Sequence, residues 1–312
     1  MINILSDNFK HNVLSLLSTF LLIFGLSTTV NAKTFIFACE QEWASLSKEI
    51  GQEHIEVFAA VSASQDPHYL RAKPSLMSRI RKADLVVCSG ASLEVGWLPL
   101  VLQKGQVQVQ PGNIGNIEVA QHVDLIEKSD VYDRSLGDVH PEGNPHSHLD
   151  PDVILGAAAV IANRLAAIDP ENKNSYETNL NLFEERWRSA VARWTDLAAP
   201  LNGKNVVIYH KSFSYLLRFL NMEASASIEP KPGISPSTGD LAKLVNRVNS
   251  MEDRPLAIIL APHEPRKAGE WLSDKVGLDI LALPFTVGGT AETKDLFDLY
   301  EISISLLLEK IE

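Results

Sequence analysis

The chain has 312 residues, with 28 basic side chains against 39 acidic ones and a net charge of −11. An acidic chain without a basic stripe argues against nucleic acid as a partner. Residues 33–312 are too many for a typical single domain and indicate two.

The first predicted element is an export signal at residues 1–32. Lys10 and His11 precede the apolar run 13–26, and Val30-Asn31-Ala32 has the small-x-small pattern that signal peptidase cleaves. The apolar run is shorter than the roughly 20 residues that span a membrane. We therefore expect cleavage after about Ala32 and a soluble mature chain in the periplasm. The alternative is an uncleaved N-terminal anchor; without a cysteine at the cleavage site, nothing suggests a lipid anchor.

Short apolar runs alternate with helix-length segments through residues 34–110. We expect strands at 34–39, 55–61, 84–90 and, with a weaker pattern, 106–110, and helices at 42–51, 74–83 and 93–105. This alternation is typical of a parallel sheet covered by helices.

Two long helical stretches follow, at 151–167 and 171–198, and Asp169-Pro170 separates them. The second stretch has an apolar stripe at near-helical spacing: Tyr176, Leu180, Phe183, Trp187, Val191 and Trp194. A stripe of this kind usually packs on a core. We therefore expect a stiff helical connection between two lobes.

A second alternation of strands and helices fills the C-terminal third of the chain. We expect strands at 205–210, 223–229, 256–261 and 279–284, and helices at 212–221, 239–251, 266–277 and 293–310, with Ser237 or Thr238 capping the second of these helices. The sequence thus predicts an α/β fold of two lobes, each with a mostly parallel sheet flanked by helices, joined by a long rigid helix. The expected bounds are 33–168 for the N-terminal lobe, 169–199 for the inter-lobe helix and 200–312 for the C-terminal lobe.

The two cysteines, Cys39 and Cys88, each lie near the end of a predicted strand. Two cysteines do not make a disulfide scaffold. They can pair in an oxidising compartment, or they can be two buried thiols, which is the simpler expectation.

Six of the nine histidines lie in loops or at strand ends where ligands gather: His68, His140, His146, His148, His210 and His263. In open α/β sheets, ligands bind beyond the carboxyl ends of the strands. Neutral imidazole is a good ligand for zinc, copper and nickel, whereas calcium and magnesium prefer oxygen. The pattern therefore indicates a transition metal held by imidazoles from both lobes.

Three short motifs resemble those of the periplasmic solute-binding proteins of zinc and manganese ABC transporters. Asp66-Pro67-His68 matches the first ligand motif of that family, NPHSHLDP (144–151) matches the second, and HKSFSYL (210–216) matches the third. The resemblance covers essentially the whole mature chain. It implies that His68, His146 and His210 are metal ligands in a cleft between two metal-binding lobes.

The fourth ligand of many family members has no counterpart in this chain. Where relatives often carry an aspartate near the last strand, this chain has Leu283. His148, Glu229, His140 and water are the alternatives for the fourth position. The acidic loop 130–148 stands where some zinc receptors have a long histidine-rich loop.

The resemblance implies a monomeric receptor that delivers its ion to the membrane permease of an ABC transporter, which works with an ATPase. It implies neither catalysis nor an organic cofactor. Zn²⁺ is favoured over Mn²⁺ as the transported ligand because three imidazoles make a nitrogen-rich site, although copper binds such sites more tightly in principle. Because binding needs deprotonated imidazoles, affinity is expected to fall as the pH drops through about 6.5.

Three other functions compete with this interpretation. A zinc enzyme would need a general base, and the sequence offers only Glu229 and Glu264 as partners, without an HExxH motif. An adhesin or chaperone could use the same fold without transport. A receptor for an organic solute is disfavoured because the expected lining is imidazole rather than aromatic.

Overall fold

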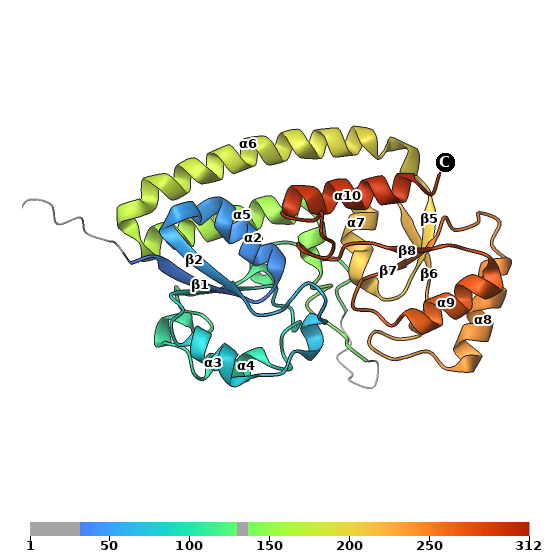
Figure 1. Ribbon diagram of the computed structural model, residues 1–312, viewed down its shortest axis with the longest axis horizontal. Coiled ribbons are helices and arrows are strands. Elements are labelled where there is room, and N and C mark those ends of the chain that lie inside the picture. Colours follow the sequence, from blue (N-terminus) through green and yellow to red (C-terminus); the bar gives the residue numbers. More distant parts are fainter. Residues whose placement is uncertain (1–31, 130–136, 312) are drawn as a thin grey trace, which may run out of the picture. The chain divides into compact units, whose positions relative to one another are not determined.

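The computed structural model describes residues 32–129 and 137–311 (Figure 1). The expected export signal at 1–32 lies outside the described residues except for Ala32, and so does the first part of the loop 130–148.

The N-terminal lobe is built on a four-stranded parallel sheet in the order β2-β1-β3-β4. Its strands are β1 (Thr34–Ala38), β2 (Ile55–Ala59), β3 (Leu85–Cys88) and β4 (Asn116–Glu118). The central strands β1 and β3 read TFIFA and LVVC and are buried throughout. Continuous apolar runs of this kind are typical of strands covered on both faces. The helices of this lobe are α2 (Gln41–Gly51), α3 (Pro74–Ile80) and α4 (Leu98–Leu102).

Two expectations for this lobe are wrong. The strand expected at 106–110 is instead a 3₁₀ turn, Val107–Val109, in which Val107 is exposed and Val109 buried, and the fourth strand follows at Asn116–Glu118. The helix expected at 93–105 is regular only over Leu98–Leu102. Pro99 lacks a backbone N–H and is tolerated only in the first turn of a helix, so the helix begins next to it.

The C-terminal lobe repeats the same strand order, β6-β5-β7-β8, again with all strands parallel. Its strands are β5 (Asn205–Ile208), β6 (Glu223–Ser227), β7 (Ile258–Leu260) and β8 (Ile280–Ala282). The helices are α7 (Ser214–Phe219), α8 (Thr238–Asn249), α9 (Arg266–Val276) and α10 (Leu296–Leu308). Ser237 caps α8 through a reciprocal capping box with Asp240. The predicted fold class is confirmed.

Two helices connect the lobes: α5 (Pro151–Ile168) and the long α6 (Lys173–Leu197). They break at Asp169-Pro170, as the sequence predicts. Figure 1 shows α6 running alongside α5 and α10, and it packs against both and against α2. By length and hydropathy α5 could cross a membrane, but it is a core helix that buries Val153, Ile154 and Ile161 between its neighbours.

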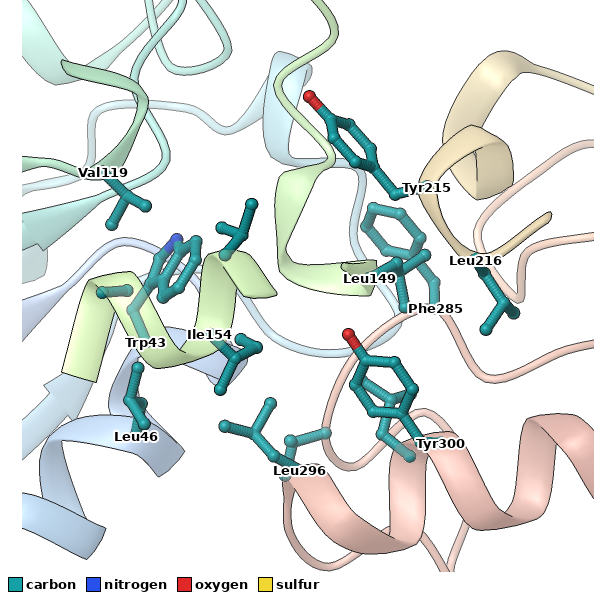
Figure 2. Packing of buried hydrophobic residues seen from close by; sticks show 14 of the residues in the cluster. Trp43, Leu46, Val119, Leu149, Ile154, Tyr215, Leu216, Phe285, Leu296 and Tyr300 are labelled. Atoms are coloured by element: carbon teal, nitrogen blue, oxygen red, sulfur yellow. The ribbon is translucent and has the colours of Figure 1, made fainter. Parts of the chain in front are cut away.

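One apolar cluster contains residues from both lobes and both connecting helices. Figure 2 shows part of it, with Trp43, Ile154, Phe285 and Tyr300 grouped together. The predicted stripe of α6 enters this cluster through Tyr176, Phe183, Trp187 and Trp194, whereas Leu180 and Val191 are only half-buried. A shared core of this kind makes the connection rigid, because close-packed interiors resist deformation.

Cys39 and Cys88 form a disulfide, in place of the two unbonded thiols that the sequence favoured. They lie at the carboxyl ends of the neighbouring strands β1 and β3, with their Cα atoms 4.8 Å apart, a normal disulfide separation. Sequence spacing alone gave no sign that these two strand ends are adjacent.

Replacing Trp187 by alanine tests the role of α6. The indole is fully buried, donates its Nε1–H to the Pro151 carbonyl at 3.0 Å and packs against Tyr300 with ring centroids 5.4 Å apart. We expect Trp187→Ala to lower the free energy of unfolding by about 3–5 kcal/mol. Urea denaturation measures this, with the exposed Arg193→Ala on the same helix as the control, expected within about 0.5 kcal/mol of the parent. Equal effects would mean that α6 does not carry the inter-lobe core.

Candidate metal centre

Three of the predicted histidines meet between the two lobes. One ligand nitrogen from each of His68, His146 and His210 lies within 4.8 Å of the others. The ring centroids are 5.4 to 5.9 Å apart in the three pairs. The three residues come from the 3₁₀ turn after β2, the loop before α5, and the segment directly after β5. Segments far apart in the sequence therefore converge at one point.

His68 is held by the residue that caps its own turn. The Asp66 carboxylate accepts the backbone N–H of His68 at 2.9 Å and lies 2.8 Å from its Nδ1. Because a carboxylate oxygen accepts, Nδ1 carries the proton. The lone pair of Nε2 is then free to bind an ion.

His146 is held in the same way by a neutral side chain. Asn144 Oδ1 accepts the His146 backbone N–H at 3.0 Å and its Nδ1–H at 2.8 Å. The Asn144 amide in turn donates to the Lys211 carbonyl in the other lobe, at 2.9 Å. Burial, together with the neighbouring imidazoles of His210 and His68, lowers the pKa of His146 well below its ordinary value. The ring is therefore neutral at neutral pH.

Glu229 lies behind His210. Its Oε2 is 2.7 Å from His210 Nδ1 and also accepts the backbone N–H of Gly233 at 2.9 Å. This carboxylate therefore contacts the nitrogen of His210 opposite to the one that faces the site.

A fourth imidazole, His140, joins the group. Its Nδ1 is 2.8 Å from the Ala91 carbonyl, an acceptor, so Nδ1 donates and Nε2 keeps a lone pair. His140 Nε2 is 3.2 Å from His68 Nε2, so the Nε2 atoms of the two rings face each other. Two nitrogens bound to one tetrahedral zinc ion at 2.0–2.1 Å would be roughly 3.3 Å apart. The separation thus suits a shared cation.

The pKa of His140 is lowered to about 4, first by burial and then by the neighbouring His68. The Ala91 carbonyl acts against this shift without cancelling it. A cavity of about 160 Å³ lies beside the imidazoles and is lined in part by His140, His146 and His210. The site is small and nitrogen-rich, and the lowered pKa values of His140 and His146 keep these two rings neutral at neutral pH.

An unusual backbone conformation supplies the anchor of His140. Gly90, Ala91 and Ser92 have φ values of 76°, 48° and 64°, all left-handed. For a residue with a Cβ this costs about 1–2 kcal/mol and persists only when the surroundings enforce it. The Glu94 carboxylate holds the loop by accepting the N–H groups of Ser89 and Gly90 at 2.8 and 3.2 Å. Sequence reasoning missed this loop, because a backbone carbonyl gives no compositional signal.

His148 is placed outside the imidazole group. It is buried, its Nε2 donates to the Phe285 carbonyl at 2.8 Å, and its Nδ1 lies 3.1 Å from a Glu42 oxygen. Glu42 also accepts the Thr286 hydroxyl. His148 therefore ties the N-terminal lobe to the 285–286 segment of the C-terminal lobe.

The structure also places three further residues singled out in the sequence. Leu283 is fully buried in the apolar core. His263 packs edge-on against Phe285, and burial lowers its pKa. Glu264 is buried and accepts the Ser212 hydroxyl at 3.0 Å and the Ala261 N–H at 2.7 Å. Its pKa is raised to about 8, mainly by burial and further by Glu229 and Asp66.

Two parallel α/β lobes on a shared helical core, with imidazoles from both converging between them, define the class of two-lobed periplasmic binding proteins for metal ions. Within that class, the chain belongs to the ZnuA family, described as "zinc-uptake complex component A periplasmic", whose model matches residues 36–309. It is therefore a substrate-binding protein rather than an enzyme.

Relatives of this chain carry different metals in their names. The chain is 24% identical over 281 residues to the iron ABC transporter substrate-binding lipoprotein MtsA of Streptococcus pyogenes serotype M1, covering 86% of each chain. It is 24% identical over 214 residues to the high-affinity zinc uptake system protein ZnuA of Yersinia pestis, covering 63% of this chain and 65% of that one.

Solved structures share the fold at low sequence identity. A crystal structure of ZnuA aligns with a TM-score of 0.72 and 21% identity, over 89% of this chain and 99% of that one. A nickel complex of FpvC from P. aeruginosa aligns with a TM-score of 0.73 and 21% identity, over 90% and 97%.

The pH dependence of stability tests the buried Glu264. Its pKa in the folded state, about 8, exceeds the ordinary value of 4.5. The contribution of Glu264 to the free energy of unfolding is therefore fully present below about pH 4.5 and is lost as the pH rises through 8. We therefore compare the metal-free Glu264→Gln variant with the parent at two pH values. The stability of the variant relative to the parent should be higher at pH 8 than at pH 5. Denaturant midpoints at both pH values measure this, with the exposed Glu270→Gln as the matched control. A pH-independent difference would contradict the burial argument.

Proposed function

We propose that this protein is a periplasmic receptor that binds Zn²⁺ as its transported substrate in the cleft between the lobes. The observation that carries the proposal is the common arrangement of four imidazoles, each fixed through Nδ1 by an acceptor, with His68 Nε2 and His140 Nε2 only 3.2 Å apart. Anchored ring nitrogens of this kind are the usual support of metal-bound histidines.

The proposed ligands are His68, His146 and His210, with His140 as the fourth. His140 is favoured over the other candidates for the fourth position because its Nε2 faces that of His68. Glu229 is proposed to orient the His210 ring through the contact with its Nδ1. His148 is proposed to fasten the lobes, since its Nε2 bonds to the Phe285 carbonyl and its Nδ1 lies 3.1 Å from a Glu42 oxygen.

Four nitrogen donors favour zinc. Manganese prefers oxygen ligands, and the carboxylates of Asp66 and Glu229 are used as anchors of the rings. Zinc accepts a tetrahedral set of four imidazole nitrogens without strain. Relatives named for zinc, iron and manganese show that the family name alone does not decide the metal. Nickel and copper are the competing ions to include in any titration.

The proposed route is export, capture and delivery. Residues 1–32 would direct export and be removed after about Ala32. Cys39 is bonded to Cys88, so its sulfur is not available for the lipid attachment that the names of several relatives imply. The loaded receptor, as a monomer, would dock on the permease of an ABC transporter that works with an ATPase.

Metal capture is proposed to cross-link the lobes, taken as 33–168 and 200–312 with 169–199 between them. His68, His140 and His146 come from the N-terminal side of the connecting helices and His210 from the C-terminal side. An ion bound only by the closed form stabilises that form by mass action. Closure would be small, because His148, Tyr300 and the shared core already join the lobes.

Calorimetric titration of zinc, manganese and nickel into metal-stripped protein tests the ligand set. We expect one tight zinc site that weakens by about 100-fold or more in His210→Ala and His140→Ala, beyond the roughly tenfold loss expected for the supporting Glu229→Gln. The exposed His122→Ala is the matched control and should leave the affinity unchanged. Unchanged zinc binding in His140→Ala would exclude it as the fourth ligand.

Proton release on binding gives a separate test. The pKa values of His140 and His146 lie far below the ordinary 6.5, so both rings are already neutral in the metal-free protein at pH 6. Protons compete for these two rings only at lower pH, so these two of the four proposed ligands release no proton when zinc binds at pH 6. We therefore expect at most two protons released per zinc ion, from calorimetry in buffers of different ionisation enthalpy. Three or more protons would contradict the proposed burial of these rings.

A further inference from the structure

We propose that the Cys39–Cys88 disulfide is a positioning element of the metal site that acts through the 89–92 loop on His140. The inference rests on the proposed function, because it assigns His140 to the ligand set. It gives the disulfide a role in metal affinity in addition to any role in stability.

The disulfide fixes the backbone at the position where the 89–92 loop begins. Cys39 follows β1 directly and Cys88 is the last residue of β3, and both are almost fully buried. The Cys39 N–H donates to the Val87 carbonyl at 2.8 Å, so the two strand ends are already in register where the sulfur atoms join. The next residue along the chain, Ser89, begins the loop.

The residues after the two cysteines continue the connection. Ser89 Oγ donates to the Glu40 carboxylate at 3.2 Å and accepts the Trp43 Nε1–H at 2.9 Å. Ser89 and Gly90 also donate their backbone N–H groups to Glu94. This set of fixed groups holds three successive left-handed residues that an unrestrained chain would not adopt.

The loop acts on one proposed ligand through one hydrogen bond. The Ala91 carbonyl accepts the His140 Nδ1–H at 2.8 Å, three residues after Cys88. The other three imidazoles have their anchors in Asp66, Asn144 and Glu229, which belong to other segments. A displaced loop should therefore disturb His140 first and leave a weaker three-histidine site.

The test is a double-variant cycle on the full mature chain with Zn²⁺ as the probe. The pair Cys39→Ala/Cys88→Ala removes the bond and is measured alone and together with His140→Ala, by competition with a zinc chelator. We expect the pair alone to weaken zinc binding by about 10-fold, the lower end of the range for residues that orient a ligand. In the His140→Ala background, the same pair should change the affinity by less than about twofold, because coupled residues are not additive.

Val101→Ala is the matched control for simple loss of stability. Val101 is fully buried in the same apolar cluster as both cysteines. It should lower the unfolding midpoint without changing zinc affinity. If Val101→Ala weakens zinc binding as much as the cysteine pair does, the effect is general softening of the lobe and the proposal is overturned.

Further outcomes distinguish failure of the positioning role from failure of the proposed function. An unchanged affinity in the cysteine pair, or equal losses with and without His140, would overturn the positioning role while the zinc receptor stands. A parent protein that binds no zinc would overturn the proposed function instead. If the cysteine pair does not fold, Glu94→Ala removes both acceptors of the loop N–H groups with both cysteines intact. It should show the same non-additivity with His140→Ala, and additive losses there would overturn the proposal.

Discussion

The hydrogen bond from each imidazole Nδ1 to a fixed acceptor is the interaction on which the site depends. Asp66, Asn144, Glu229 and the Ala91 carbonyl each lie 2.7 to 2.8 Å from the Nδ1 of one ring and so fix its orientation. Without these acceptors, four rings close together would rotate apart or share protons. Asp66, Asn144 and Ala91 precede α5 in the chain and Glu229 follows α6, so the acceptors come from both lobes.

That arrangement requires a frame that does not flex. Close packing supplies it: Trp187 and Trp194 of α6 pack on Tyr300 of α10, and the Tyr300 hydroxyl donates to the His148 carbonyl at 3.0 Å. His148 follows the His146 segment directly, so the connecting helices reach the site through one short turn. The long helix and the imidazole cluster are parts of one packed unit rather than a hinge with a separate pocket.

Much of this architecture could be predicted from the sequence. Buried parallel strands can be predicted from their apolar runs. Motifs after two strands indicated His68 and His210, and a motif in the loop before α5 indicated His146, although their role as ligands stays a prediction. The alternating pattern at 106–110 wrongly predicted a strand, because Val109 is buried whereas Val107 is exposed. The pairing of Cys39 with Cys88 and the contact of Ala91 with His140 each join residues about 50 positions apart. Such contacts are set by the tertiary fold, and a backbone acceptor carries no side-chain signature at all.

The nature of the four acceptors has one more consequence, for ionic charge. Two of them, Asp66 and Glu229, are carboxylates, and the other two, Asn144 and the Ala91 carbonyl, are neutral. With neutral rings, a doubly charged ion would cancel the two carboxylates and leave the cleft without net charge from these groups. A singly charged ion such as Cu⁺ would leave one negative charge uncompensated in a partly buried place, which is costly. The two carboxylates, Asp66 and Glu229, would thereby favour doubly charged over singly charged ions whatever their coordination geometry.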